Sequence, residues 1–471
     1  MAEEHIPLEQ SPLWMEIRPI MEDKAKPVKY EYRGMLHTTK EDIPIFKIVS
    51  IDVVRDYTTC MGDRRHIEFK MALGDYITRM YPYRTNLELS VKRIQLEETS
   101  GQAKEDAKIE TERYKAVFLP KANIHPSGTE LEQHDTESMN KVDLVDVKLD
   151  LLDRSLEPLR VKTTSGVFRN ATAHQLMHSV MVGESNKIKV DGKPAIDGID
   201  IVKPHNQALN RHIILKSGQH ITDIPSHLQE HMNGVYNAGI GTYLQKYKDR
   251  KLWFVYPLWS TKRFDEDVPK VVFYAVPAER FPSLDRTYRE EGKILKILVS
   301  SRRKYFDSAE TDHMNNGSGF KQADANAFMR KPVKITDEGP VGMRANLNTE
   351  LAARQRDDGL NYAPVSDRPI SSNVYTEYSK VNARNIARID LTWENAQHDL
   401  ICPGMPCKYI HLNKNKLVEV KGVVLFVHAM TSLQVPGMSN IIYRNICTIT
   451  IGTEISSHRP DIPTAKTYGV Y

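Results

Sequence analysis

Alternation of apolar and polar residues constrains this chain more than any other feature, because it recurs in two blocks near the two ends. In the first block, Ile67, Phe69 and Met71 alternate with charged residues. A period of two is typical of a strand with one buried face. Four more segments of the block also predict strands: IFKIVSIDVVRD, NLELSVKRIQL, YKAVFLP and VDLVDVKLDLL. Residues 1–153 are therefore expected to form a small β-barrel or sandwich domain.

The alternation returns near the C-terminus, where Ile389, Leu391 and Trp393 form the apolar side of ARIDLTWEN. Further strand-like segments follow it: CKYIHL, LVEVKGVVLFVHAMTSL and NIIYRNICTITIGTEI. Residues 373–471 are expected to form a second small β-barrel domain.

Helices and strands mix between the two blocks. A short helix is expected over Thr172–Met181, capped by Asn170 or Thr172, and a second helix is expected to start at Thr222 or Asp223. The apolar segments LWFVYPLW, KVVFYAVP and KILKILVS then predict three strands. The aromatic residues of the first are expected to be core, or contact anchors if the strand is partly exposed. The predicted fold class is mainly β, with a central α+β domain over 154–299 flanked by two small β-barrel domains.

The segment 300–372 has few large apolar residues and is rich in Asn, Asp, Gly and Arg. Such a stretch cannot bury enough apolar surface to offset its ordering entropy by itself. We therefore expect an extended polar excursion or arm, ordered by neighbouring subunits or partners.

Composition excludes several classes of protein. The 471 residues hold 65 Lys and Arg against 61 Asp and Glu, with 40% hydrophobic and 27% charged residues, a balance typical of folded domains. The net charge of +4 lies entirely from Lys380 onward, where ten basic residues face six acidic ones. This excess is too small to predict a specific nucleic-acid groove, which leaves nucleic-acid binding as the weakest hypothesis.

Neither a membrane span nor a secretory signal is expected. No stretch approaches the ~20 apolar residues of a spanning helix, and the N-terminal MAEEHIPLEQSPLWM lacks the basic start and apolar run of a signal peptide. The four cysteines are therefore expected to be free thiols in a reducing cytosol.

Histidine pairs offer the main alternative to a structural role. His174 and His178 have the i, i+4 spacing that lets two imidazoles share one metal, but Gln175 stands where a metalloprotease needs its Glu. His227 and His231 repeat the spacing. Further histidines in the same region are His205, His212 and His220. A metal-dependent enzyme built on these histidines is the alternative function, although surface or interface histidines are the more frequent case.

Other motifs point to structure rather than to chemistry. Cys402 and Cys407 frame CPGMPC, whose four-residue spacing differs from redox and zinc motifs and whose Pro and Gly predict a tight turn. The Gly-rich segment 315–319 lacks the Lys and Ser/Thr of a phosphate-binding loop. We assign no catalytic, cofactor-binding or metal-ligating residue, and expect no enzymatic activity.

The C-terminal segments also carry a resemblance to a known family. The order is ARIDLTWEN, then DLICPGMPCKYIHL, then LVEVKGVVLFVHAMTSL and IIYRNICTITIGTEI. Pro403 and Gly404 form the Pro-Gly turn between strands, and Val427 and His428 form a strand-ending "V.H" segment. This arrangement resembles the baseplate hub protein of contractile phage tails, the T-even-type hub. Its relatives include late control protein D and the N-terminal part of type VI secretion spike proteins. The stretches 48–87 and 222–258 are similar to the first barrel and the middle of that family.

The resemblance implies a function that works by geometry. Two similar barrels per chain would let a homotrimer present six barrels in a ring, which would join a hexameric tail tube to a trimeric central spike. It implies a virion protein of the tail baseplate that is made in the host cytoplasm. The implied partners are the tail tube protein and the central spike protein, with tape measure and baseplate wedge proteins as further ones. No cofactor is implied.

Overall fold

The computed structural model describes the two β-rich ends and the central region of the chain. The described residues are 11–22, 29–96, 109–118, 144–232, 234–277, 287–305, 321–322, 349–350, 379, 383, 386–413, 416–433 and 443–454. Most of the predicted arm over 300–372, including the Gly-rich segment 315–319, lies outside these residues. The described part is mainly β, which confirms the predicted fold class.

The first β-rich region is a strongly curved sheet that turns back on itself. Its strands lie in the order β3 (Lys47–Asp56), β4 (Arg64–Ala72), β7 (Leu144–Asp153), β6 (Ile109–Phe118), β5 (Leu87–Leu96), β1 (Lys29–His37) and β2 (Asp42–Pro44). Because β2 leads directly into β3, the last strand of this order adjoins the first. The Ile45 amide, between β2 and β3, donates to the Gly34 carbonyl at 3.1 Å and so extends the β1–β2 pairing toward β3. The sheet therefore forms a barrel, with Ile67, Phe69 and Met71 buried inside as predicted.

The second barrel closes where one continuous stretch of chain, β17 followed by β18, pairs first with one strand and then with another. Its strands are β15 (Lys270–Ala275), β16 (Tyr288–Glu291), β17 (Ile294–Val299), β18 (Ser301–Tyr305), β21 (Ile386–Glu394), β22 (Pro406–Asn413), β23 (Lys416–Leu433) and β24 (Tyr443–Glu454). β15 lies between β17 and β22 and is parallel to both, and β22, β23, β24 and β21 follow in antiparallel pairs. β17 runs into β18, which pairs with β21 and so completes the circle. Ile389, Leu391 and Trp393 are buried inside, as predicted.

Strand β15 illustrates what local sequence cannot show. It lies within the predicted central region 154–299, yet it pairs with β22 more than 130 residues away. A parallel pair needs a crossover connection, so its partner is never a sequence neighbour. The structure therefore adds the strands of 270–299 to the second barrel, and the four-part domain division stays a prediction.

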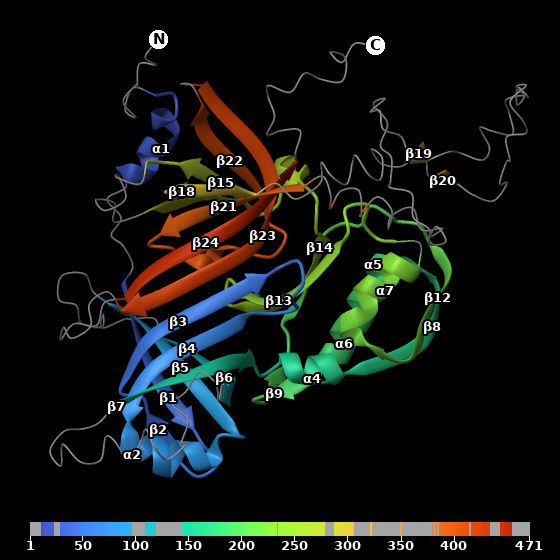
Figure 1. The fold of residues 1–471 in the computed structure, drawn as a ribbon. Coiled ribbons are helices and arrows are strands. Elements are labelled where there is room, and N and C mark those ends of the chain that lie inside the picture. Colours follow the sequence, from blue (N-terminus) through green and yellow to red (C-terminus); the bar gives the residue numbers. More distant parts are fainter. Residues whose placement is uncertain are drawn as a thin grey trace, which may run out of the picture.

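One antiparallel pair joins the two barrels into a continuous sheet. Phe426–Ser432 of β23 lies beside Ser50–Asp56 of β3. Figure 1 shows the orange-red strands of the second barrel lying alongside the blue strands of the first. Backbone hydrogen bonds thus fix the two barrels side by side.

The central region forms a separate lobe of short helices and small sheets, drawn in green in Figure 1. The Thr172 hydroxyl caps α5 (Ala173–Leu176) by accepting from the Gln175 amide, and the helical path continues through η4 (Met177–Met181) and α6 (Val182–Ser185). This confirms the helix predicted over Thr172–Met181 and its cap. The second helix is α7 (Ile224–His231), which starts after Asp223 with Pro225 in its first turn.

Small sheets complete the lobe. The hairpin β13 (Ile240–Tyr247) and β14 (Arg250–Pro257) carries β11 (Gly198–Ile201) on one side. A two-stranded ribbon pairs β8 (Thr163–Ala171) with β12 (Asn210–His220) and curves around the helices. Two short strands, β9 (Lys189–Val190) and β10 (Lys193–Pro194), lie near α4 (Leu156–Val161).

Helix α1 (Trp14–Met21) packs against the second barrel. The apolar side chains of Leu13, Ile17 and Ile20 contact Tyr274 and Leu298 on the outside of that barrel. Within the described residues, no helix is both long and apolar enough to cross a bilayer.

Candidate functional site

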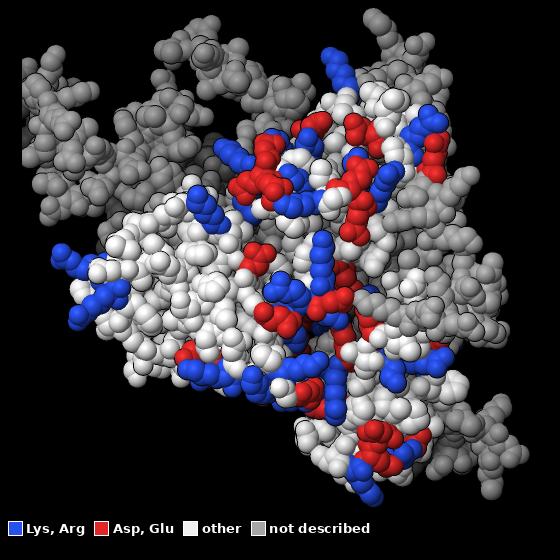
Figure 2. All heavy atoms as spheres, turned by 180° about the vertical axis from the view of Figure 1, so that it is seen from behind, with Lys and Arg blue, Asp and Glu red and all other residues white. Residues whose placement is uncertain are grey.

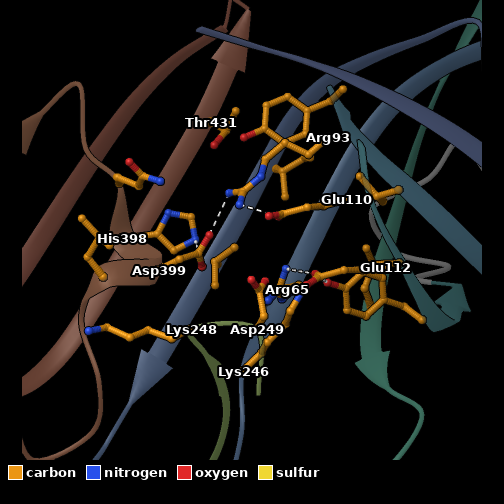
Figure 3. Close-up of a pocket in the computed structure, with 18 residues that line it drawn as sticks. Arg65, Arg93, Glu110, Glu112, Lys246, Lys248, Asp249, His398, Asp399 and Thr431 are labelled. Atoms are coloured by element: carbon orange, nitrogen blue, oxygen red, sulfur yellow. Dashed lines mark hydrogen bonds and ion pairs between the residues drawn. The ribbon is translucent and has the colours of Figure 1, made fainter. Parts of the chain in front are cut away.

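A network of charges, with buried Arg55 at its centre and half-buried partners around it, lies where the first barrel, the central hairpin and the second barrel meet, and we call it the junction network. Its members are Arg55, Asp63, Arg65, Arg93, Glu110, Glu112, Lys246, His398 and Asp399. Figure 3 shows several of these side chains converging on one cavity of about 260 Å³.

Arg55 is the centre of the network. It lies on β3, and its side chain is only 1% exposed. Its Nε donates to both Asp63 oxygens at 3.2 Å, its Nη2 donates to Asp399 Oδ1 at 3.0 Å, and its Nη1 donates to the His398 carbonyl at 3.0 Å. Asp63 follows β3 in the first barrel, whereas His398 and Asp399 belong to the turn η8 (His398–Leu400) between β21 and β22. One guanidinium thus connects both barrels.

Arg93 makes the same connection from β5. Its Nη1 donates to Asp399 Oδ2 at 2.8 Å, and its Nη2 donates to Glu110 Oε2 at 2.6 Å. Asp399 is therefore held between two arginines of the first barrel, although it is carried by the second. A carboxylate shared by two guanidinium groups resists separation, because either arginine would be left without its counter-charge.

Arg65 and Lys246 add the central lobe to the network. Arg65 Nη2 donates to Asp63 Oδ2 at 3.0 Å, and its Nη1 donates to Glu112 Oε2 at 3.3 Å. Lys246 of β13 donates to the other Glu112 oxygen at 3.0 Å. A neutral hydrogen bond also links the first barrel to β13, because the Tyr57 hydroxyl donates to Gln245 Oε1 at 3.0 Å.

The electrostatics keep Glu112, Asp399 and Arg55 ionised. Burial alone would raise the pKa of Glu112, but Arg65 and Lys246 lower it to about 2. Burial would likewise raise the pKa of Asp399, yet the cations around it hold that pKa well below its usual range. For Arg55, burial would lower the pKa, but the Asp63 and Asp399 carboxylates raise it above its ordinary value. Positive and negative groups are thus present in matched numbers, so the ion pairs can hold the adjoining elements together.

The junction network was missed by sequence reasoning, although the sequence holds a signal for it. Arg55 follows Ile51 and Val53 at the same alternate spacing, so it falls on the buried side of its strand. Arg65 precedes Ile67 in the same way. A charged residue in step with the apolar side of a strand indicates a buried ion pair.

The structure does not bring the predicted histidines into a metal site. His174 and His178 are both exposed on one helical face, with ring centroids 6.4 Å apart. His227 is buried, and one of its ring nitrogens lies 3.1 Å from the Ile214 carbonyl. Among the described residues, no three of His, Cys, Asp and Glu form a group that could hold a metal ion. The metal-dependent enzyme therefore gains no support from the geometry.

The cysteines and the aromatic strand have structural surroundings. All four cysteines are free thiols, and burial raises the pKa of Cys402 to about 12. Gly404, between Cys402 and Cys407, has φ +63° and its Cα lies against the Tyr256 ring. The aromatic residues Trp253, Phe254 and Tyr256 are buried, which confirms the core interpretation of LWFVYPLW.

Comparison with known proteins gives matches at the level of structure. No family model matches the sequence, and no curated protein matches it. The chain is similar to solved phage tail proteins. The prophage MuSo2 43 kDa tail protein from Shewanella oneidensis matches with a TM-score of 0.45 and 9% identity, over 89% of this chain and 98% of the other.

Two further structures match over most of this chain. A tail protein from Neisseria meningitidis MC58 matches with a TM-score of 0.42 and 10% identity, over 91% of this chain and 98% of the other. An E. coli component of the type VI secretion system matches with a TM-score of 0.40 and 9% identity, over 88% and 76%.

The junction network makes the stability of the chain sensitive to acid. Burial lowers the pKa of His398 to about 4, against the opposing Asp399 carboxylate and with the help of the nearby arginines. Between pH 6.5 and that pKa, the unfolded chain binds a proton that the folded chain does not bind. Unfolding free energy should therefore fall by roughly 2–3 kcal/mol from pH 7 to pH 4.5. Glu112 adds a further loss below its ordinary pKa.

Urea denaturation of His398→Gln at the two pH values checks this expectation. The variant should lose much of the pH dependence, because glutamine does not titrate. His428→Gln on β23 is the matched control and should keep it. An unchanged pH dependence in His398→Gln would show that His398 is not the group responsible.

Proposed function

We propose that the chain is a structural baseplate hub of a contractile phage tail. In this function a homotrimeric ring presents its barrels in pseudo-six-fold order and connects the hexameric tail tube to the trimeric central spike. The tube and spike proteins are the main partners, tape measure and baseplate wedge proteins are further ones, and the site of action is the tail baseplate. No catalysis is part of this function.

The observation that carries the proposal is the similar closure of the two barrels. In the first barrel, β2 pairs with β1 and leads into β3. In the second, β17 pairs with β15 and leads into β18, which pairs with β21. Each barrel is closed by two consecutive strands with different partners. A chain with two modules of similar construction can fill two adjacent places in a ring, so three copies can fill six.

The rigid connection between the barrels supports the same function. The β3–β23 pair fixes their relative position through the backbone, and Arg55 and Arg93 fix it through Asp399. A hub that adapts one symmetry to another needs its modules at a constant separation. The domain boundaries at residues 153 and 372 belong to this proposal, and the strands of 270–299 are counted with the second barrel.

Light scattering during size-exclusion chromatography tests the assembly. We expect a particle of three times the 53.9 kDa chain mass, and electron microscopy should show a three-fold ring with a central hole. Purified tail tube protein should bind to the ring and not to an unrelated trimer. A stable monomer without affinity for tube protein would overturn the proposal.

A further inference from the structure

Two stretches of the central lobe contain no acidic residue. They are 158–183 and 201–222, and together they hold 48 residues. Since 61 of the 471 residues are Asp or Glu, about six would be expected there. The same stretches carry six Lys and Arg and five His: Arg160, Lys162, Arg169, Lys203, Arg211 and Lys216, with His174, His178, His205, His212 and His220. The two stretches therefore form a positively charged part of the lobe, although basic and acidic residues balance over the chain as a whole before Lys380.

The fold places these stretches side by side. β8 comes from the first and β12 from the second, and they pair as the two-stranded ribbon. In Figure 2 the outer rim of this lobe, at the left of the view, carries Lys and Arg without Asp or Glu. Pairing thus turns two separate stretches into one surface, which we call the ribbon face.

The centre of the ribbon face is apolar. Val167 and Ile214 lie directly opposite each other in the ribbon and are 59% and 50% exposed. The alternate residues Ile213 and Leu215 are fully buried against the helices, so the ribbon already has its core side. Two branched apolar side chains therefore lie next to each other on the outer side, where they can supply apolar contact area to a partner.

Basic residues flank this apolar pair. Arg169 and His212 form the next outward pair, and Lys216 lies two residues from Ile214 on the other side. Among the described residues, Arg169, Arg211 and Lys216 enter none of the ion pairs, whereas Lys162 pairs with Glu184. An apolar centre with a polar, charged rim is the usual composition of a protein interface.

We propose that the ribbon face docks an acidic surface or extended segment of a partner protein that carries apolar side chains. Charge complementarity determines the partner's sign, because the face has cations and no carboxylate of its own. A protein is favoured over a nucleic acid, since the centre of the face is aliphatic and Phe168, the ribbon's aromatic residue, packs against the core. This inference stands on the lobe alone and does not depend on the hub function.

A defined probe tests the proposal on the full chain. The probe is a fluorescein-labelled peptide of about twelve residues with alternating Glu and Val, and its binding is measured by anisotropy. We expect binding that weakens at least about threefold between 0.05 and 0.3 M salt, because a screened charge interaction contributes to it. The matching Lys–Val peptide should not bind.

Matched variants locate the binding surface. Arg169→Glu with Lys216→Glu should weaken the Glu–Val peptide about tenfold or more. Lys189→Glu with Lys193→Glu makes the same charge change on the same lobe outside the ribbon face, and should stay within about twofold. Equal weakening by both pairs would reduce the effect to net charge and overturn the proposal.

A second comparison separates a protein site from a general polyanion site. Val167→Ser with Ile214→Ser should weaken the peptide about threefold or more without lowering the melting temperature by more than a few degrees. A single-stranded DNA of similar length should bind more weakly than the peptide. Serine variants that bind as well as the wild type, or DNA that binds as tightly as the peptide, would contradict a protein-docking face.

Discussion

Replacing Arg55 by methionine is expected to lower the free energy of unfolding by about 3–5 kcal/mol, because the change removes a fully buried cation and leaves the half-buried Asp63 and Asp399 without the arginine that they share. The loss should also separate the two barrels energetically. We therefore expect the urea unfolding curves measured by tryptophan fluorescence and by far-ultraviolet circular dichroism to coincide in the wild type and to differ in the variant.

Two companion variants make this expectation specific. Arg113→Met removes an exposed arginine whose Nε pairs with Glu88 at 2.6 Å, and should cost about 1 kcal/mol or less. Adding Asp399→Asn to Arg55→Met should recover part of the lost stability, since the carboxylate that has lost one of its two arginines is then gone. A single Arg55→Met variant within about 1 kcal/mol of the wild type would show that the network does not hold the barrels together.

The network also shows where sequence reasoning succeeds and where it stops. Alternation predicted β4 and β21 with their buried sides correctly, because burial on one face of a strand acts on local sequence. It did not predict β1, whose KYEYRGMLH is polar, or the ribbon strands β8 and β12. β1 and β8 bury little apolar surface of their own, and β12 buries only Ile213 and Leu215, so pairing with a neighbour determines these strands more than a long pattern does.

Partner choice in the second barrel was beyond local sequence for a different reason. The apolar runs of β15 and β17 predict buried strands, but nothing in a buried run indicates which strand lies next to it. The junction network has the same character. Arg55 can be seen to point inward, whereas its pairing with Asp399 joins residues 344 positions apart. The site could therefore be predicted as buried charge but not as a joint between domains.

The second large expected effect concerns Trp393, in the core of the second barrel. Its side chain is fully buried, its Nε1 donates to the Thr287 hydroxyl at 2.9 Å, and that hydroxyl donates to the Glu394 carbonyl at 2.7 Å. Trp393→Ala should lower the free energy of unfolding by about 3–5 kcal/mol, as large-to-small aromatic substitutions in cores do. Trp393→Phe keeps most of the volume and should cost less.

Arg388 offers the contrast on the same strand, because it lies on the opposite, exposed side of β21. Arg388→Glu should change the stability of the chain by no more than about 0.5 kcal/mol. Under the hub function it should nevertheless weaken assembly of the ring or its binding to tube protein, since the outward sides of the barrels are then the contact surfaces. Thermal melting measures the effect on stability, and sedimentation measures the effect on assembly. If Arg388→Glu leaves sedimentation unchanged, and charge reversal at Glu68 and Lys70 on the first barrel does so too, these faces are not contacts. In that case the second barrel would still be stabilised by its Trp393 core, but the outward faces of the barrels would not hold a ring together.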